Sequence, residues 1–402
     1  MPRQPERLLP WLGGFLISVN LYLLPFMDDS PRATDLAGGL LLVWLVIELA
    51  RHRQPAAPLA LAGVLGLTPL LWLFFSVLND HATTLVLAAR WLLAIPWALA
   101  LMRILGHEDR QSRFAWGLIH GGLVGTVVIV LQWLGFEQML QMAGLSSTHA
   151  EYHHYVALTV RIPGMHGQHN ASSSVVSLLV PAAFYLFYTG RLRLPALSGI
   201  LFALLVTLHL TSTRSPLIVA VLTIGFASVL AKRVGRSLLI AFFLVSVLVP
   251  VVAVYGPPGG WARWRNLEAL NSNATERLDS TLGAAELSIT HPWGWGAKLG
   301  QRMLSEKTGI GATHNAFLQT SLVFGLVQGM ILLLGFVVLI LRGTGGADGP
   351  YFLPSLLAFH TAGLFMFEEH LNNPTFIILA AWVILAAFTG RVRTGKSRSG
   401  SP

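Results

Sequence analysis

The fold is decided by long apolar runs, and the clearest spans residues 314–341, which read HNAFLQTSLVFGLVQGMILLLGFVVLIL. This run contains no Asp, Glu, Lys or Arg. It is longer than the roughly 20 residues that a helix needs to cross a bilayer. The run therefore predicts a membrane-spanning helix that begins at His314, and it shows what to look for elsewhere in the chain.

The composition extends this prediction to the whole chain. Of the 402 residues, 54% are hydrophobic and only 11% are charged, which is too apolar for a soluble protein of this length. The expected fold is an all-α polytopic membrane protein, with about 12 transmembrane helices in a single integral membrane domain over residues 1–402. The expected spans lie near 8–26, 35–50, 57–77, 82–103, 114–135, 171–189, 196–211, 215–231, 237–254, 314–341, 351–367 and 373–390.

The loop charges predict the orientation. An even number of spans places both termini on one side, and the loops on that side hold more than half of the 27 Lys and Arg residues. Positive residues collect in cytoplasmic loops, so both termini are expected in the cytoplasm. The first residues resemble a signal peptide, but no small-residue cleavage site follows, and we expect a retained first helix.

The net charge of +9 limits the expected partners. Most of this charge falls in short loops between spans, where it sets orientation and meets anionic lipid headgroups. Membrane lipids are therefore expected partners, and nucleic acid is not. The chain has no cysteine, which excludes disulfides and thiolate metal sites.

Two outer segments are much longer than turns. They cover residues 137–170 and 255–313, and short helices are expected in the second. Long loops in a compact protein usually carry function. The residues with chemical potential lie in these segments or at the ends of the neighbouring spans.

Arginines gather on this outer side, where a membrane protein ordinarily has few. They are Arg161, Arg214, Arg263, Arg265 and Arg277. The guanidinium fork matches pairs of phosphate oxygens, so the cluster predicts an anionic ligand such as pyrophosphate. Two alternatives stay open. Arg214 could be a snorkelling anchor, and Arg277 could pair with the nearby Asp279 or Glu276.

His314 stands at the outer start of its span, between Thr313 and Asn315. A histidine there is wet enough to ionise, and its ordinary pKa near neutrality suits a general base. The alternative is a helix-entry residue beside a cap formed by Thr313 or Asn315.

The segment from Arg161 to Asn170 ends the first long outer loop. Its Pro163 and Gly164 predict a bent backbone, and Asn170 is expected to cap the following helix. His166 and His169, with His153 and His154 upstream, offer a metal site as an alternative to substrate binding. A zinc site usually needs a third protein ligand and an ordered second shell, which favours the interpretation as loop histidines.

No metal or cofactor is expected. Asp28-Asp29 is the only adjacent acidic pair that we assign to the outer side, and it could bind a divalent cation only weakly. The chain has no Walker loop, dinucleotide fingerprint or nucleophile elbow, which disfavours ATP hydrolysis and serine acyl transfer.

Taken together, these motifs resemble the O-antigen ligase (WaaL) family, within the wider group of O-antigen ligases, polymerases and protein O-oligosaccharyltransferases. In that family a His and an Asn, Ser or Gln are followed by nine residues and a Gly. The matching segments here are His314-Asn315 with Gly325, Arg161 to Asn170, Ser212 to Arg214, and Arg277 followed by His291-Pro292-Trp293-Gly294-Trp295-Gly296. The continuation Leu326-Val327-Gln328 departs from the hydroxylated pair often found there.

The resemblance implies a GT-C-like, inverting and metal-independent glycosyltransferase in the bacterial inner membrane, with a periplasmic active site. It would move a polysaccharide from undecaprenyl pyrophosphate to the lipid A–core oligosaccharide, with His314 as general base and arginines neutralising the leaving diphosphate. The substrate-binding residues so implied are Arg161, Arg214, Arg265, Arg277, His169, Asn170, Asn315 and Arg263.

Two other functions stay open at this point. An O-antigen polymerase or a protein O-oligosaccharyltransferase would use the same donor in the same membrane. A transporter of an anionic solute belongs to a different class, but transporters usually show paired repeats and polar groups at the midplane. We find no internal repeat, and the polar residues of this chain concentrate at one face.

Overall fold

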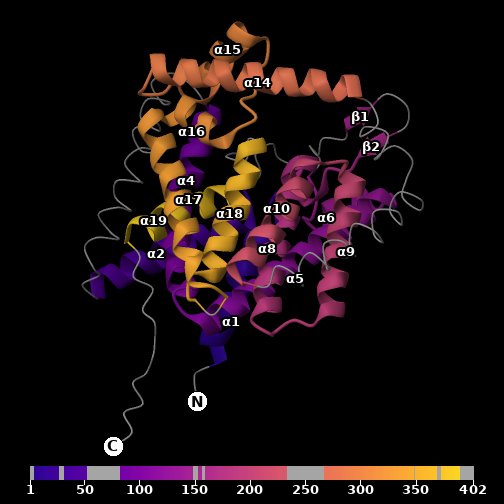
Figure 1. Ribbon diagram of the computed structural model, residues 1–402, viewed down its shortest axis with the longest axis vertical. Coiled ribbons are helices and arrows are strands. Elements are labelled where there is room, and N and C mark those ends of the chain that lie inside the picture. The colour runs from indigo at the N-terminus through magenta and orange to yellow at the C-terminus, as the bar shows by residue number, and fades with distance from the viewer. Residues whose placement is uncertain are drawn as a thin grey trace, which may run out of the picture.

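The protein is described here by a computed structural model, drawn in Figure 1. The structure describes residues 4–26, 31–51, 82–147, 153–155, 159–232, 267–347, 349–368 and 373–389. These residues are almost entirely helical, as the apolar runs predict, apart from one short hairpin of two antiparallel strands that pairs His153 with Arg161.

The first half of the chain contains α1 (Gln4–Ser18), α2 (Ala33–Arg51), α4 (Ala82–Leu105), α5 (Glu108–Trp133), α6 (Glu137–Met142), β1 (His153–Tyr155), β2 (Thr159–Arg161), the 3-10 helix η1 (Gly164–His166), α7 (His169–Ser177) and α8 (Leu179–Tyr188). The second half contains α9 (Leu194–Thr211), α10 (Ser215–Leu230), α14 (Leu267–Thr290), α15 (Ala297–Thr308), α16 (Ala316–Phe324), α17 (Leu326–Arg342), the 3-10 helix η3 (Gly343–Gly345), α18 (Phe352–Phe367) and α19 (Pro374–Thr389).

Most predicted spans correspond to a helix or to a broken pair of helices. The spans expected at 57–77 and 237–254 lie outside the described residues. The first span, predicted to reach residue 26, is shorter because α1 ends at Ser18 and the chain then turns to pair Tyr22 with Arg32. The spans predicted at 171–189 and 314–341 are each interrupted, at Leu178 and at Gly325.

Several helices are suited to a bilayer. Four stretches are long and apolar enough to cross one, namely Glu108–Trp133, His169–Tyr188, Leu194–Thr211 and Leu326–Gly345. One side of α17 exposes Val327, Met330, Leu334, Val337 and Leu341. An exposed apolar face of this length marks contact with lipid or protein. The described part thus agrees with a polytopic membrane protein, and the total of about twelve spans stays a prediction.

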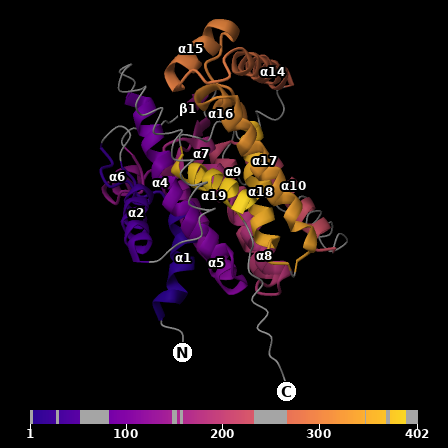
Figure 2. The ribbon, with the colours of Figure 1, turned by 90° about the vertical axis from the view of Figure 1, so that its left-hand side faces the viewer.

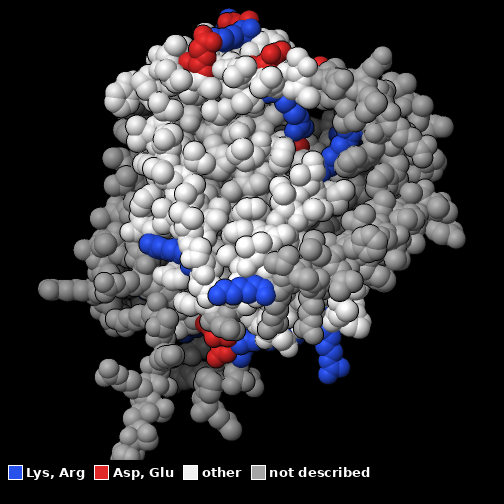
Figure 3. Space-filling model, viewed as in Figure 1, with Lys and Arg blue, Asp and Glu red and all other residues white. Residues whose placement is uncertain are grey.

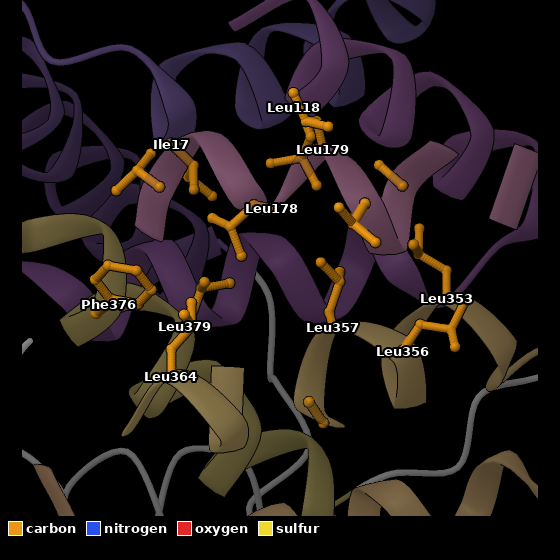
Figure 4. Packing of buried hydrophobic residues seen from close by; sticks show 14 of the residues in the cluster. Ile17, Leu118, Leu178, Leu179, Leu353, Leu356, Leu357, Leu364, Phe376 and Leu379 are labelled. Atoms are coloured by element: carbon orange, nitrogen blue, oxygen red, sulfur yellow. The ribbon is translucent and has the colours of Figure 1, made fainter. Parts of the chain in front are cut away.

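The core is apolar and closely packed. Figure 4 shows side chains from α1, α5, α8, α18 and α19 meeting there, among them Ile17, Leu118, Leu179 and Leu357. Gly117 lets α5 approach α1, because a Cβ at this position would collide with the carbonyl oxygen of Trp11. Small residues allow such backbone contact between membrane helices.

The connections between helices lie at two opposite ends of the bundle. At one end, Arg191 forms an ion pair with Glu108 at 3.4 Å, and Gln111 Nε2 donates to the carbonyl of Pro350 at 2.7 Å. These contacts join the α4–α5, α8–α9 and α17–α18 connections. At the other end, α14 and α15 lie across the bundle beyond α16, and Figures 1 and 2 show this from two sides.

Candidate active site

A buried carboxylate gathers four segments of the chain at the end of the bundle that carries α14. Glu368 follows the last residue of α18 and is only 6% exposed. Its Oε1 accepts hydrogen bonds from Ser215 Oγ at 2.7 Å and Arg277 Nη2 at 3.5 Å. Its Oε2 accepts from Asn170 Nδ2 at 3.1 Å. The side chains come from the starts of α7 and α10 and from α14.

Arg277 contacts α18 in two ways. Besides its bond to Glu368, its Nη1 donates to the carbonyl oxygen of Phe367 at 2.9 Å. The sequence left open a pairing with Asp279 or Glu276, and the structure shows Glu368 as the partner instead. The reason is direction, because Arg277 lies on the side of α14 that faces the bundle, whereas Asp279 and Glu276 are exposed.

The positive charges at this end oppose one another. Burial lowers the pKa of Arg214, and the charge of Arg277 lowers it further. Arg214 directly precedes Ser215, whose hydroxyl bonds to the same carboxyl oxygen of Glu368 that Arg277 contacts. Burial raises the pKa of Glu368 despite its hydrogen bonds and the attraction of Arg277. An added anion would relieve the repulsion between the arginines.

His314 belongs to the same environment. Burial lowers its pKa below the ordinary value of 6.5, and the charge of Arg277 lowers it further. The imidazole is therefore neutral at neutral pH, as a general base must be. The backbone of His314 has φ +50°, in the left-handed region that a non-glycine residue rarely adopts. Such strain is concentrated at functional sites.

The neighbours of His314 hold it in place. Asn315 caps α16, and its side-chain oxygen accepts from the backbone N–H groups of Phe317 at 3.0 Å and Leu318 at 3.1 Å. This confirms the cap by Asn315 that the sequence offered as an alternative at this position. On the other side, Ser280 of α14 donates to the carbonyl of Ala312.

The segment from Arg161 to Asn170 packs beside this cluster. Arg161 Nη1 donates to His169 Nε2 at 2.5 Å, and both side chains are buried. The prediction that Asn170 caps the next helix is wrong, because α7 already begins at His169 and its N-cap residue is Gln168. Being inside the helix, Asn170 turns its amide toward Glu368 instead.

The remaining predicted residues fall into two groups. Arg263, Arg265 and the Asp28-Asp29 pair lie outside the described residues. His166 is described, and its Nδ1 accepts from Asn373 Nδ2 at 3.1 Å. Within the described ranges, no three His, Cys, Asp or Glu residues lie together as a metal site would require.

The stretch from His291 to Gly296 docks against the break between α16 and α17. The backbone N–H of Leu326 donates to the carbonyl of Pro292 at 2.8 Å, and that of Trp295 to the carbonyl of Leu322 at 2.7 Å. Gly325 has φ +102°, and a Cβ there would lie 2.7 Å from the oxygen of Pro292. Two separate sequence motifs thus form one structural unit that supports α16, the helix that follows His314.

This end of the molecule is open on one face. In Figure 3, basic side chains border a hollow below the upper end, and an acidic side chain is visible within it. Sequence reasoning found the arginines but missed Glu368 and treated Asp28-Asp29 as the only adjacent acidic pair outside. Glu368-Glu369, which directly follows the span predicted at 351–367, is a second such pair and was the available signal.

Comparison with known proteins agrees with the motifs. Residues 199–342 match a family model described as O-antigen ligase. Arg214, Arg277 and His314 lie inside the matched region, and Arg161, His169, Asn170 and Glu368 lie outside it. No curated protein matches the chain significantly. The family match confirms the resemblance indicated by the motifs, and residues 199–342 carry the domain of the O-antigen ligase family.

Proposed function

We propose that the protein is an O-antigen ligase that transfers a polysaccharide from undecaprenyl pyrophosphate to a sugar of the lipid A–core oligosaccharide. It would act as a multi-pass protein of the bacterial inner membrane, with its termini in the cytoplasm and its site at the periplasmic face. The observation that carries the proposal is the juxtaposition of Arg214, Arg277 and a neutral, half-buried His314 at one end of an apolar bundle.

Arg277 and Arg214 would bind the diphosphate of the donor. Burial makes the charge of Arg214 costly, and Arg277 adds a second positive charge nearby, so a bound diphosphate would stabilise both cations. Arg161, Arg263 and Arg265 are proposed to extend this binding along the donor, together with His169, Asn170 and Asn315. Neutralising the diphosphate makes it a better leaving group without a metal ion.

His314 would act on the acceptor. Its neutral imidazole takes the proton of the acceptor hydroxyl while the oxygen attacks the anomeric carbon of the donor sugar. The bond between that carbon and the phosphate oxygen breaks, and undecaprenyl pyrophosphate leaves with the electron pair. Attack on the face opposite the diphosphate inverts the anomeric centre. Metal independence predicts that transfer continues in excess EDTA.

A deletion strain tests this function against its alternatives. A ligase deletion leaves lipid A–core without polymer and accumulates lipid-linked polymer, and the wild-type gene restores the normal pattern. Core that bears a single repeat unit would instead identify a polymerase. An unchanged lipopolysaccharide would reject both and leave protein glycosylation or transport to be examined.

A further inference from the structure

Glu368 takes no part in the chemistry proposed above, yet both of its carboxylate oxygens accept hydrogen bonds from other segments of the chain. Three side chains from α7, α10 and α14 donate to its two carboxylate oxygens, at 3.1, 2.7 and 3.5 Å. Buried carboxylates are costly unless such partners are present. The desolvation of this carboxylate costs free energy, and the carboxylate lies at the proposed phosphate site. A role in donor binding would account for both observations.

We propose that Glu368 is a positioning residue that aims the Arg277 guanidinium at the diphosphate of the donor. This proposal depends on the proposed function in one respect, namely that the ligand is a polyprenyl diphosphate. Glu368 does not touch the donor in this account and acts through Arg277.

The geometry of Arg277 carries the argument. Its two terminal nitrogens donate to two groups at the C-terminal end of α18, the carbonyl oxygen of its last residue Phe367 and the carboxylate of Glu368, which follows it. A guanidinium is planar, so two such contacts fix its plane. It also has more N–H donors than these contacts use, and the others remain for a phosphate. A side chain held this way loses less conformational entropy when the ligand arrives.

Ser215 and Asn170 hold Glu368 in turn. Ser215 is the first residue of α10 and follows Arg214, so the same carboxylate also fixes the segment that carries the second arginine. Asn170 donates to the other carboxylate oxygen. A glutamine cannot replace this arrangement, because its NH₂ group would face either the donor of Asn170 or the donors of Ser215 and Arg277.

The test measures donor binding and transfer separately in protein reconstituted in nanodiscs. The probes are undecaprenyl pyrophosphate and undecaprenyl monophosphate for binding, and the lipid-linked polysaccharide with lipid A–core for transfer. The variants are Glu368→Gln, Arg277→Ala and their combination. Glu137→Gln is the matched control, because Glu137 also accepts hydrogen bonds, from Gln141 and Ser146, but lies on α6 outside the cluster.

Glu368→Gln is expected to weaken binding of undecaprenyl pyrophosphate about tenfold, the scale of one hydrogen bond to a charged group. The KM for the donor rises in parallel, while the KM for the acceptor stays unchanged. In the Arg277→Ala background the same substitution has no further effect, since Glu368 acts through Arg277. A merely structural role would alter both KM values and would add to the effect of Arg277→Ala.

Unchanged diphosphate binding in Glu368→Gln, or effects that multiply in the double variant, overturns the proposal. If Glu368→Gln does not fold, Ser215→Ala replaces it in the same cycle with the same criteria, because it removes only the 2.7 Å bond to the carboxylate. Wild-type protein that binds the diphosphate but transfers no glycan rejects the proposed function alone. Wild-type protein that does not bind it rejects both.

Discussion

At the α14 end, burial disfavours the ionised forms of several individual side chains. Burial lowers the pKa of both Arg214 and His314 and raises that of Glu368, so each ionised form is less stable than in water. Arg277 adds to the first two shifts and opposes the third. A bound diphosphate would stabilise the two arginines and leave the imidazole next to an anion instead of a cation.

His314→Ala is expected to lower glycan transfer by about 10²–10⁴-fold, the usual contribution of a general base. Diphosphate binding should change little, because the imidazole acts on the acceptor. Transfer assays on purified protein, with matched amounts of folded variant, measure the effect. An active His314→Ala enzyme would end the assignment of His314 as the base.

The transfer rate should also report the ionisation of His314. Only the neutral imidazole accepts a proton, so the rate falls as the pH drops through its pKa, which lies below 6.5. Burial is the main cause of this shift and the charge of Arg277 the second, so Arg277→Gln should move the acidic limb upward. A pH profile of kcat/KM at saturating acceptor measures the limb. An acidic limb that stays in place in Arg277→Gln would show that Arg277 does not act on this histidine.

Glu368→Gln should change how the stability of the protein depends on pH. A carboxyl with a raised folded-state pKa contributes stability below its unfolded pKa and loses it as the pH rises through the folded pKa. The neutral glutamine carries no such loss. Thermal unfolding in detergent between pH 4 and pH 8 should therefore show wild type weakening relative to Glu368→Gln as the pH rises. The opposite trend would mean that the hydrogen bonds outweigh burial.

Residue-scale features were only partly predictable. Arg214 and Arg277 were identified because positive charge on the outer side of a membrane protein is unusual in any sequence, and His314 because it stands at the outer start of a predicted span. Glu368 was missed because its partners lie 91 to 198 positions away along the chain. A local sequence pattern cannot reveal contacts between residues so far apart. In the sequence alone, Glu368 is indistinguishable from an ordinary loop residue.

At the scale of elements, the important feature is that two apolar runs are not continuous helices. The run 314–341 breaks at Gly325 into α16 and α17, and 171–189 breaks at Leu178 into α7 and α8. In both cases the outer half carries site residues at its N-terminal end. Hydropathy predicted the runs correctly but not the breaks, since a glycine or leucine within an apolar stretch does not lower its hydropathy enough to be seen.

Gly325→Ala tests the importance of the break. The new Cβ meets the carbonyl of Pro292 at 2.7 Å, and φ +102° is unfavourable for alanine. We expect a loss of about 1–3 kcal/mol in the free energy of unfolding. Transfer should fall as well, because His314 directly precedes Asn315, the N-cap residue of α16. Gly309→Ala is the control, since Gly309 also has positive φ, at +77°, but has open space around it. Equal effects at both positions would mean that backbone strain alone, and not the docked motif, is responsible.

At the scale of the whole molecule, the helices separate two chemically different ends. Arg191, Glu108, Gln111 and Pro350 meet at one end, and the Glu368 cluster lies at the other. The sequence predicted this separation, because successive loops alternate between the two sides of the membrane and most basic residues fall in the loops of one side. The placement of α14 across the bundle was not predictable, because its only strong signal was a helix-like stretch within a long outer segment.

Thiol labelling can establish which end faces the periplasm. The chain contains no cysteine, so single cysteines can be introduced without removing any. Ser305 on α15 and Thr344 in η3 are both exposed and lie at opposite ends. A membrane-impermeant maleimide should label Ser305→Cys in cells whose outer membrane is permeabilised, and Thr344→Cys only after the inner membrane is disrupted. The reverse result would place His314 in the cytoplasm and remove the basis for the proposed function.

The attachments of α14 have a mechanical consequence. Through Arg277 this helix is tied to the end of α18, and through Ser280 to Ala312, two residues before His314. A shift of α14 that moved Arg277 away from the departing lipid diphosphate would also displace Ala312 and the neighbouring His314. Release of the spent carrier and disengagement of the base would then be a single movement, which would limit wasteful cleavage of the donor by water between turnovers.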